Sequence, residues 1–169
     1  KDYFPQFKDL TVESSKTIFA DAEITLDKNT NLIAAQGHLQ GEFIKANTAH
    51  FQYLSSHFQW IKKKLKTNSI LRINDRNSLV KTEWDAESGD YICTLNGSTF
   101  SSDFNPIFPK WWHNTFKDFS YTDDTKCFHD FAFYGTTQSS IPDFFLGSVQ
   151  TTNLTYKSVP IKHGDLLVQ

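Results

Sequence analysis

The chain has 169 residues and a formal net charge of −2, so it carries no overall positive field of the kind that attracts nucleic acid. No apolar run approaches the roughly 18 residues that a membrane-spanning helix needs, and we expect any membrane anchor to lie outside this chain. The absence of methionine and of a signal peptide predicts a segment of a larger protein.

Residues 17–27 form the first predicted strand, because apolar and polar side chains alternate there with a period of two. Its apolar face consists of Ile18, Ala20, Ala22, Ile24 and Leu26. Turn-forming residues follow at 27–31. A second alternation then places further apolar side chains on one face, at Ile33, Ala35, Leu39 and Phe43. We therefore predict a long antiparallel hairpin.

Residues 56–66 interrupt the alternation. Phe58, Ile61 and Leu65 fall at helical spacing, and the serine at position 55 or 56 is a suitable N-cap. This pattern predicts a short helix over about 56–66. Strand signals return at 70–73, 79–84 and 91–95, and Asn96-Gly97 is typical of a two-residue hairpin turn leading into 98–102.

A tryptophan-rich segment predicts a second short helix, over about 105–117. Asn105 and Pro106 are typical of a helix start, and Trp111 and Trp112 follow within it. The tryptophans have two interpretations: a stacking platform for a sugar or a nucleobase, or a plug that buries its rings at one end of a sheet. We favour the plug.

The whole chain, 1–169, is predicted to be a single β-rich segment that is mainly antiparallel. Aromatic residues, which suit pleated and half-buried surfaces, make up 15% of the sequence. The predicted organisation is three strand groups separated by the two helices: strands at about 15–55, 69–103 and 119–169, and helices at about 56–66 and 105–117. The architecture is either a curled open sheet or a closed β-sandwich.

No catalytic, metal or cofactor site is predicted. The six histidines lack the spacing of metal ligands, and no nucleophile elbow or phosphate-binding loop is present. His129 and Asp130 look like an acid–base pair, but neighbouring strand residues point to opposite faces. Cys93 and Cys127 either pair or stay free, because their spacing does not decide between the two.

Two segments resemble bacterial envelope proteins. Residues 20–27 (ADAEITLD), followed by 31–39 (NLIAAQGHL), resemble the hairpin unit of OstA-like lipopolysaccharide-transport domains. Residues 105–169 resemble the C-terminal region of large AsmA-like proteins. The likeness lies in the tryptophan helix at 110–116 (KWWHNTF) and in the strand at 154–161 (LTYKSVPI).

The resemblance implies a non-enzymatic β-groove that projects into the periplasm from an inner-membrane anchor outside this chain. It also implies a role in lipid transport between membranes or in outer-membrane assembly. Expected partners are phospholipid or another lipid, other envelope proteins, and remaining repeats of the same chain. The alternatives are a β-sandwich module that binds carbohydrate or protein, and a hydrolase with dispersed carboxylates.

A lipid groove needs one apolar sheet face that stays open. The candidate lipid-facing residues are those of the two alternating strands: Ile18, Ala20, Ala22, Ile24, Leu26, Ile33, Ala35, Leu39 and Phe43. If a second layer covers this face, the same residues form an ordinary core. Whether the face is open or covered is therefore the decisive structural question.

Overall fold

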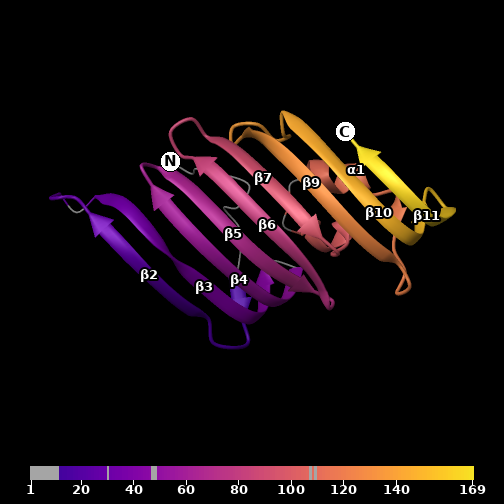
Figure 1. Ribbon diagram of the computed structural model, residues 1–169, viewed down its shortest axis with the longest axis horizontal. Helices are drawn as coiled ribbons and strands as arrows, with labels where there is room; N and C mark the ends of the chain where they lie inside the picture. The colour runs from indigo at the N-terminus through magenta and orange to yellow at the C-terminus, as the bar shows by residue number, and fades with distance from the viewer. Residues whose placement is uncertain (1–11, 30, 47–48, 107, 109) are drawn as a thin grey trace.

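The computed structural model describes residues 12–29, 31–46, 49–106, 108 and 110–169. These residues form one antiparallel sheet of eleven strands (Figure 1). The strands are β1 (Val12–Ser14), β2 (Phe19–Leu26), β3 (Leu32–Ala46), β4 (Ala49–Ile61), β5 (Lys64–Ile73), β6 (Arg76–Asp85), β7 (Asp90–Gly97), β8 (Phe119–Ser120), β9 (Lys126–Thr136), β10 (Phe144–Tyr156) and β11 (Val159–Val168).

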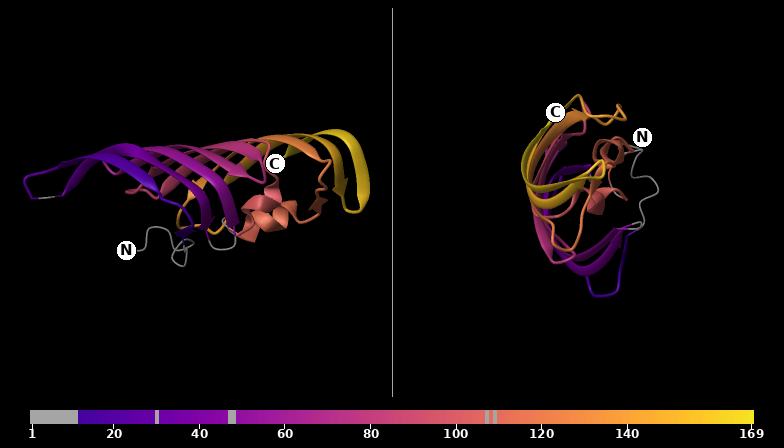
Figure 2. Two further views of the ribbon diagram at one scale, coloured as in Figure 1. Left: turned by 90° about the horizontal axis from the view of Figure 1, so that it is seen from below. Right: turned by 90° about the vertical axis from the view of Figure 1, so that its right-hand side faces the viewer.

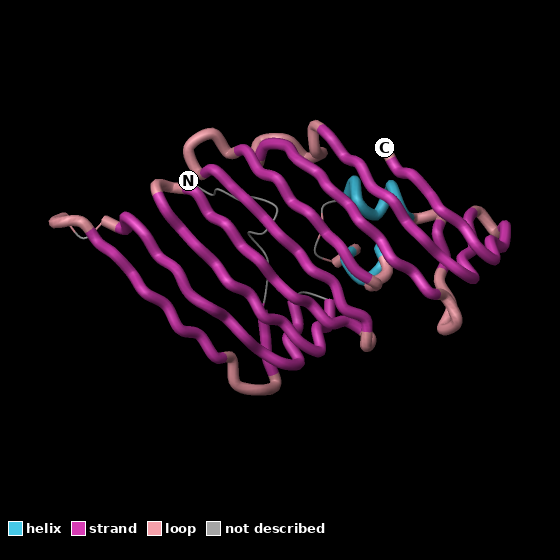
Figure 3. The backbone as a smooth tube through the Cα atoms, viewed as in Figure 1, coloured by secondary structure: helices cyan, strands magenta, loops and turns pink. Residues whose placement is uncertain are grey.

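Most neighbouring strands of the sheet also follow one another in the chain. The sheet runs from β3 through β4, β5, β6, β7, β9 and β10 to β11. At one end β1 and β2 both pair with β3, and at the other end the short β8 pairs with β10. Figure 3 shows that strands make up most of the described chain.

The sheet is curled and not closed. Seen from its end, it bends into a C-shaped wall, and the helices lie on its concave side (Figure 2). The expected all-β antiparallel architecture with an open, curled sheet is therefore confirmed. The closed β-sandwich is excluded, because all the described strands belong to this one sheet.

A 3₁₀ turn and a short helix cover part of the concave side. The turn is η2 (Ser101–Phe104) and the helix is α1 (Lys110–Phe116). We call these two elements, with Phe108 between them, the plug. The main core lies between the plug and the sheet strands β7, β9 and β10, where the buried residues include Leu95, Phe104, Trp112, Phe116, Phe131, Phe133 and Val149.

The predicted helix over 56–66 is wrong. These residues end β4 and begin β5, and Lys62 and Lys63 form the two-residue turn between them. Both lysines have positive φ (49° and 63°), as a type I′ hairpin turn requires. The strand alternation of this segment is not visible in the sequence, because the polar residue Ser56 occupies a position on the inner face. Phe58, Ile61 and Leu65 therefore stand at a spacing that resembles a helix.

The second predicted helix is present but shorter. It begins at Lys110 and ends at Phe116, whereas the predicted range was 105–117, of which residues 107 and 109 lie outside the described part. The predicted Asn96-Gly97 hairpin turn is wrong as well. Both residues end β7, and the chain then leaves the sheet to form η2. β7 pairs with β6 on one side and, on the other, with β9, which comes about thirty residues later in the chain.

Candidate functional site

Cross-strand register assigns side chains to the two faces of the sheet. Leu95 is buried against the plug and pairs with Val80, and the same row continues through Ser69, Ser56 and Leu39. Directly opposed residues in an antiparallel sheet share a face. This row therefore lies on the side that carries the plug, which we call the inner face.

Apart from Arg76, which lies opposite Ile73 at the start of β6 and is paired with Asp103 of the plug, the described inner face from β2 to β7 carries no charged side chain. It takes the even-numbered residues 20–24, the odd 35–41, the even 54–60, the odd 65–73, the even 78–84 and the odd 91–95. All of these are apolar, aromatic or small, apart from a few hydroxyl side chains. Ser56 and Ser69 satisfy each other through a hydrogen bond of 2.8 Å between their Oγ atoms.

The opposite, outer face carries the charged residues of the same strands. Several are paired across strands, with Lys66 Nζ 2.8 Å from a Glu83 oxygen and Lys64 Nζ 3.1 Å from an Asp85 oxygen. Such exposed pairs contribute little to stability, because water screens the attraction between their charges. They keep this face hydrated, so the two faces of the wall differ sharply in polarity.

The plug covers the inner face over the later strands. Trp112 is fully buried, and its indole Nε1 donates a 2.8 Å hydrogen bond to the Ser101 carbonyl oxygen. A partly buried ion pair holds η2 onto the β5–β6 hairpin, with Arg76 Nη2 3.1 Å from Asp103 Oδ2. The Arg76 guanidinium also stacks over the Phe100 ring, 3.7 Å from its centroid.

We call the inner face from β2 to β6 the open face, because the plug leaves most of it uncovered. Its side chains are exposed on β2 and mostly half-buried on β3–β6, while Ile73, Ser78 and Trp84 are buried. Ile24, on the edge strand β2, is 64% exposed although its side chain is large and apolar. Leu54, Phe58, Trp60 and Leu65 continue the apolar surface and are half-buried by their own neighbours. Apolar surface on one side of a sheet that no second layer covers makes this face a candidate binding surface.

The structure places most of the predicted lining residues on this open face. Ala20, Ala22, Ile24, Ala35 and Leu39 lie there by register, and Ile18 lies beside the inner face at Gly41. Leu26 and Ile33 are exposed at the β-bulge that ends the hairpin, where strict alternation stops. Whether any of them touches lipid stays a prediction.

Phe43 does not lie on the inner face. Its φ is +51°, which breaks the alternation of β3, and Ile44 takes the inner position next to Gly41. Ile44 is buried, while Phe43 is exposed under the Lys16 ammonium group. Sequence reasoning also missed Phe58 and Trp60, because the helix predicted there placed them outside the sheet.

Trp111 and Trp112 do not form a flat exposed shelf. Their rings meet edge to face, with centroids 5.7 Å apart and an interplanar angle of 77°. Trp112 packs on Phe116 of the plug and on Phe131 of the sheet, and Trp111 contacts Phe133 and Phe145 of the sheet. This geometry matches the plug interpretation of the tryptophan pair.

The buried polar groups form a structural network. His129 is stacked on Phe131, and its ring nitrogens lie 3.2 Å from Thr99 Oγ1 and 3.3 Å from the Leu95 carbonyl oxygen. Thr99 in turn bonds Ser78, at 2.6 Å between hydroxyl oxygens. Among the described residues, none of the hydrogen bonds of His129, Thr99 and Ser78 goes to a carboxylate, and these groups satisfy one another inside the core.

The cysteines are both free thiols. Burial raises the pKa of Cys93 and of Cys127 to about 11, so both are protonated at neutral pH and neither supplies a nucleophilic thiolate. Within the described part of the chain, no three His, Cys, Asp or Glu side chains are grouped so that they could hold a metal ion.

His129 makes the stability of the fold sensitive to acid. Burial lowers the pKa of its imidazole below the ordinary value of 6.5, so the unfolded chain takes up a proton at higher pH than the folded chain. The stability that neutral His129 provides is fully present above about pH 6.5 and is lost as the pH falls through the lowered folded pKa.

The unmodified chain should lose stability between about pH 7.5 and about pH 5, measured as the free energy of unfolding in urea. We expect this decline to be smaller in His129→Gln. The matched control is His57→Gln, because His57 is exposed on the outer face. It should keep the full decline. An unchanged pH slope in His129→Gln would contradict the assignment.

A comparison of the chain with models of known protein families, with curated proteins and with solved structures finds no match in any of the three. Among the described residues, no helix is long and apolar enough to cross a membrane. A proposal about function therefore stands on the geometry of the sheet and on the resemblance of its segments.

Proposed function

We propose that this chain is a non-enzymatic wall segment of an AsmA-like envelope protein, and that its open face holds the acyl chains of lipids. Such a wall would lie in the periplasm, anchored to the inner membrane by a segment outside this chain. It would serve lipid transport between membranes or outer-membrane assembly. The observation that carries the proposal is an apolar inner face that the plug leaves uncovered over most of β2–β6; its side chains are exposed on β2 and mostly half-buried on β3–β6.

The physical argument is one of solvation. An acyl chain leaves water when it lies on apolar surface, with a gain of roughly 25 cal/mol per Å² of apolar area buried. A charge on that surface would be costly to desolvate, and the described inner-face positions carry none apart from Arg76, which is already paired with Asp103 of the plug. Five strands at their usual spacing make a surface about 19 Å long, which is comparable to one extended acyl chain.

The shape of the wall adds support. Its curl surrounds a chain on several sides, and the charged outer face keeps the opposite side in water (Figure 2). The plug ends the open face at β7, since Leu95 is already covered. Lipid is therefore expected on β2–β6 and not beneath α1.

A single charge placed on the open face tests the proposal. We expect Ser69→Asp to reduce the phospholipid that co-purifies with the chain, read by mass spectrometry, and to reduce binding of the fluorescent fatty acid cis-parinaric acid by about tenfold or more. The reason is that Ser69 lies in the middle of the inner face, so its carboxylate would be dehydrated by a bound acyl chain.

The matched control is Asn68→Asp, which adds the same charge one residue away on the outer face. It should leave lipid and probe binding unchanged. Thermal unfolding of both variants separates loss of binding from loss of fold. Equal binding by the two folded variants, or a chain that carries no lipid and binds no probe, would count against the proposal.

A further inference from the structure

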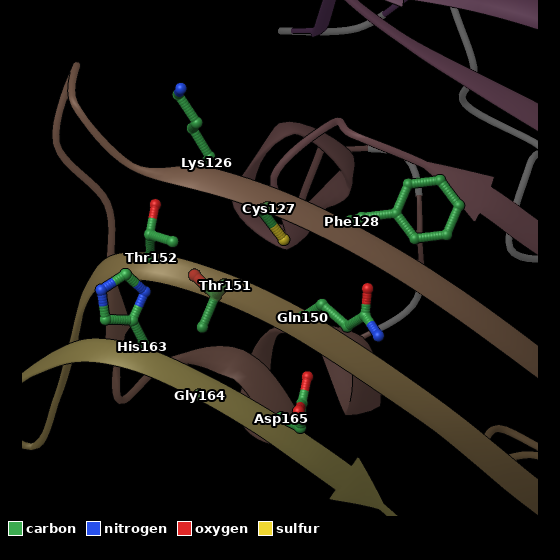
Figure 4. Close-up of a pocket in the computed structure, with 9 residues that line it drawn as sticks. All are labelled: Lys126, Cys127, Phe128, Gln150, Thr151, Thr152, His163, Gly164 and Asp165. Carbon is green, nitrogen blue, oxygen red and sulfur yellow. The ribbon is translucent and has the colours of Figure 1, made fainter.

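A depression of about 590 Å³ lies across β9, β10 and β11, near the C-terminal edge of the sheet (Figure 4). Two cross-strand rows cross it side by side. One row is Phe128, Gln150 and Asp165, and the other is Lys126, Thr152 and His163. These six side chains alternate with Cys127 and Thr151, so they belong to the outer face. We call them the outer platform.

Phe128 supplies an aromatic surface to the outer platform. Its side chain is 49% exposed although it is large and apolar. In Figure 4 the ring is seen face-on beside Gln150, with the helix behind the strands, so its face is turned to the outside of the sheet. An aromatic face presented to solvent in this way can stack on the apolar C–H face of a sugar ring.

The polar groups of the outer platform are free to bind. Within the described residues, none of Lys126, Gln150, Thr152, His163 and Asp165 has a side-chain hydrogen bond or an ion pair. Elsewhere on the outer face, lysines such as Lys64 and Lys66 are paired with carboxylates across the strands. The outer platform thus combines hydrogen-bonding capacity with an aromatic ring.

The arrangement fits the hydroxyl groups of a pyranose. The Asp165 carboxylate accepts two O–H groups, while the Gln150 amide both donates and accepts. The Cβ atoms of directly opposed residues lie about 5 Å apart, so the Gln150 and Asp165 side chains can reach neighbouring hydroxyls on one sugar ring. The second row lies two residues further along the strands, about 6.6 Å away, where Lys126 and Thr152 can bond the far side of that ring or a second sugar.

We propose that the outer platform binds a neutral saccharide, with one sugar ring stacked on Phe128 and its hydroxyls bonded by Gln150 and Asp165. The Asp165 carboxylate makes the site a poor fit for a free phosphate, although Lys126 and His163 are nearby. This site is separate from the open face and from the tryptophans of the plug. Saccharide binding there does not depend on lipid binding at the open face.

Saccharide binding is tested by isothermal titration and ligand-observed NMR with cellobiose, maltose and N,N′-diacetylchitobiose. At least one of these disaccharides should bind saturably in the millimolar range, and the open-chain polyol sorbitol, which has hydroxyls but no ring face, should not. Phe128→Leu should weaken the binding roughly two- to tenfold through loss of stacking, and Asp165→Ala should weaken it by a similar factor.

The matched control is Phe19→Leu. Phe19 is also an exposed phenylalanine of the outer face, but it lies on β2 at the other end of the sheet. Its saccharide affinity should be unchanged. Circular dichroism checks that all variants keep the sheet. Absence of binding by all three disaccharides would overturn the proposal. So would equal binding of sorbitol, unchanged affinity in folded Phe128→Leu, or saturable binding of inorganic phosphate instead.

Discussion

Replacing Trp112 with alanine is expected to lower the free energy of unfolding by about 3–5 kcal/mol. Trp112 is fully buried and contacts Phe104, Phe108, Phe116 and Phe131, so its removal leaves a large cavity between the plug and the sheet. The change also leaves the Ser101 carbonyl oxygen without its indole donor. Urea unfolding followed by far-ultraviolet circular dichroism measures the effect.

The matched control is Trp60→Ala. Trp60 is also a tryptophan of the inner face, but it lies in the part that the plug does not cover and is only half-buried. We expect a loss of about 1–2 kcal/mol there, since less apolar area returns to water. If Trp112→Ala lost no more stability than Trp60→Ala, the plug would not be the main core of the fold.

Gly147→Ala is expected to lower the free energy of unfolding by about 2–3 kcal/mol. A Cβ atom at this position of β10 would overlap the Phe131 ring. Phe131 is 1% exposed and is held by Trp112, His129 and Phe145, so its ring has no room to move away. The lower entropy of the unfolded alanine chain would offset only about 0.4–1 kcal/mol.

Gly164→Ala on the neighbouring strand β11 is the control. The nearest atom to its added Cβ would be the Ile161 Cγ2 methyl at 3.1 Å, which belongs to a side chain at the sheet edge that can shift. We expect a change within about 0.5 kcal/mol by urea unfolding. A similar large loss in both variants would show that glycine itself, and not the overlap with Phe131, matters at position 147.

Local pattern was enough to predict some elements and misleading for others. The β2–β3 hairpin was predictable because its apolar residues alternate strictly and its turn is rich in Asp and Asn. The β4–β5 hairpin was not, because inner-face serines at 56 and 69 satisfy each other across the strands. A pairing of that kind is visible only once the register is known.

The candidate sites divide in the same way. The apolar lining at Ala20, Ala22 and Ile24 was predictable, because a strand face is defined by residues two apart. The reversal at Phe43 was not, since it depends on a positive φ that the sequence around it does not indicate. The outer platform was not predictable either, because Phe128, Gln150 and Asp165 come together only through the pairing of three strands.

By itself the sequence determined that this protein is an antiparallel sheet with one apolar face and a tryptophan-rich helix, because alternation and helical spacing are local properties. Only the tertiary structure decided which part of that face is covered. The plug packs on Leu95 of β7, which precedes it in the chain, and on Phe131 and Val149 of β9 and β10, which follow it. It leaves Ile24 and its neighbours uncovered. Coverage depends on such long-range packing, and no local pattern encodes it.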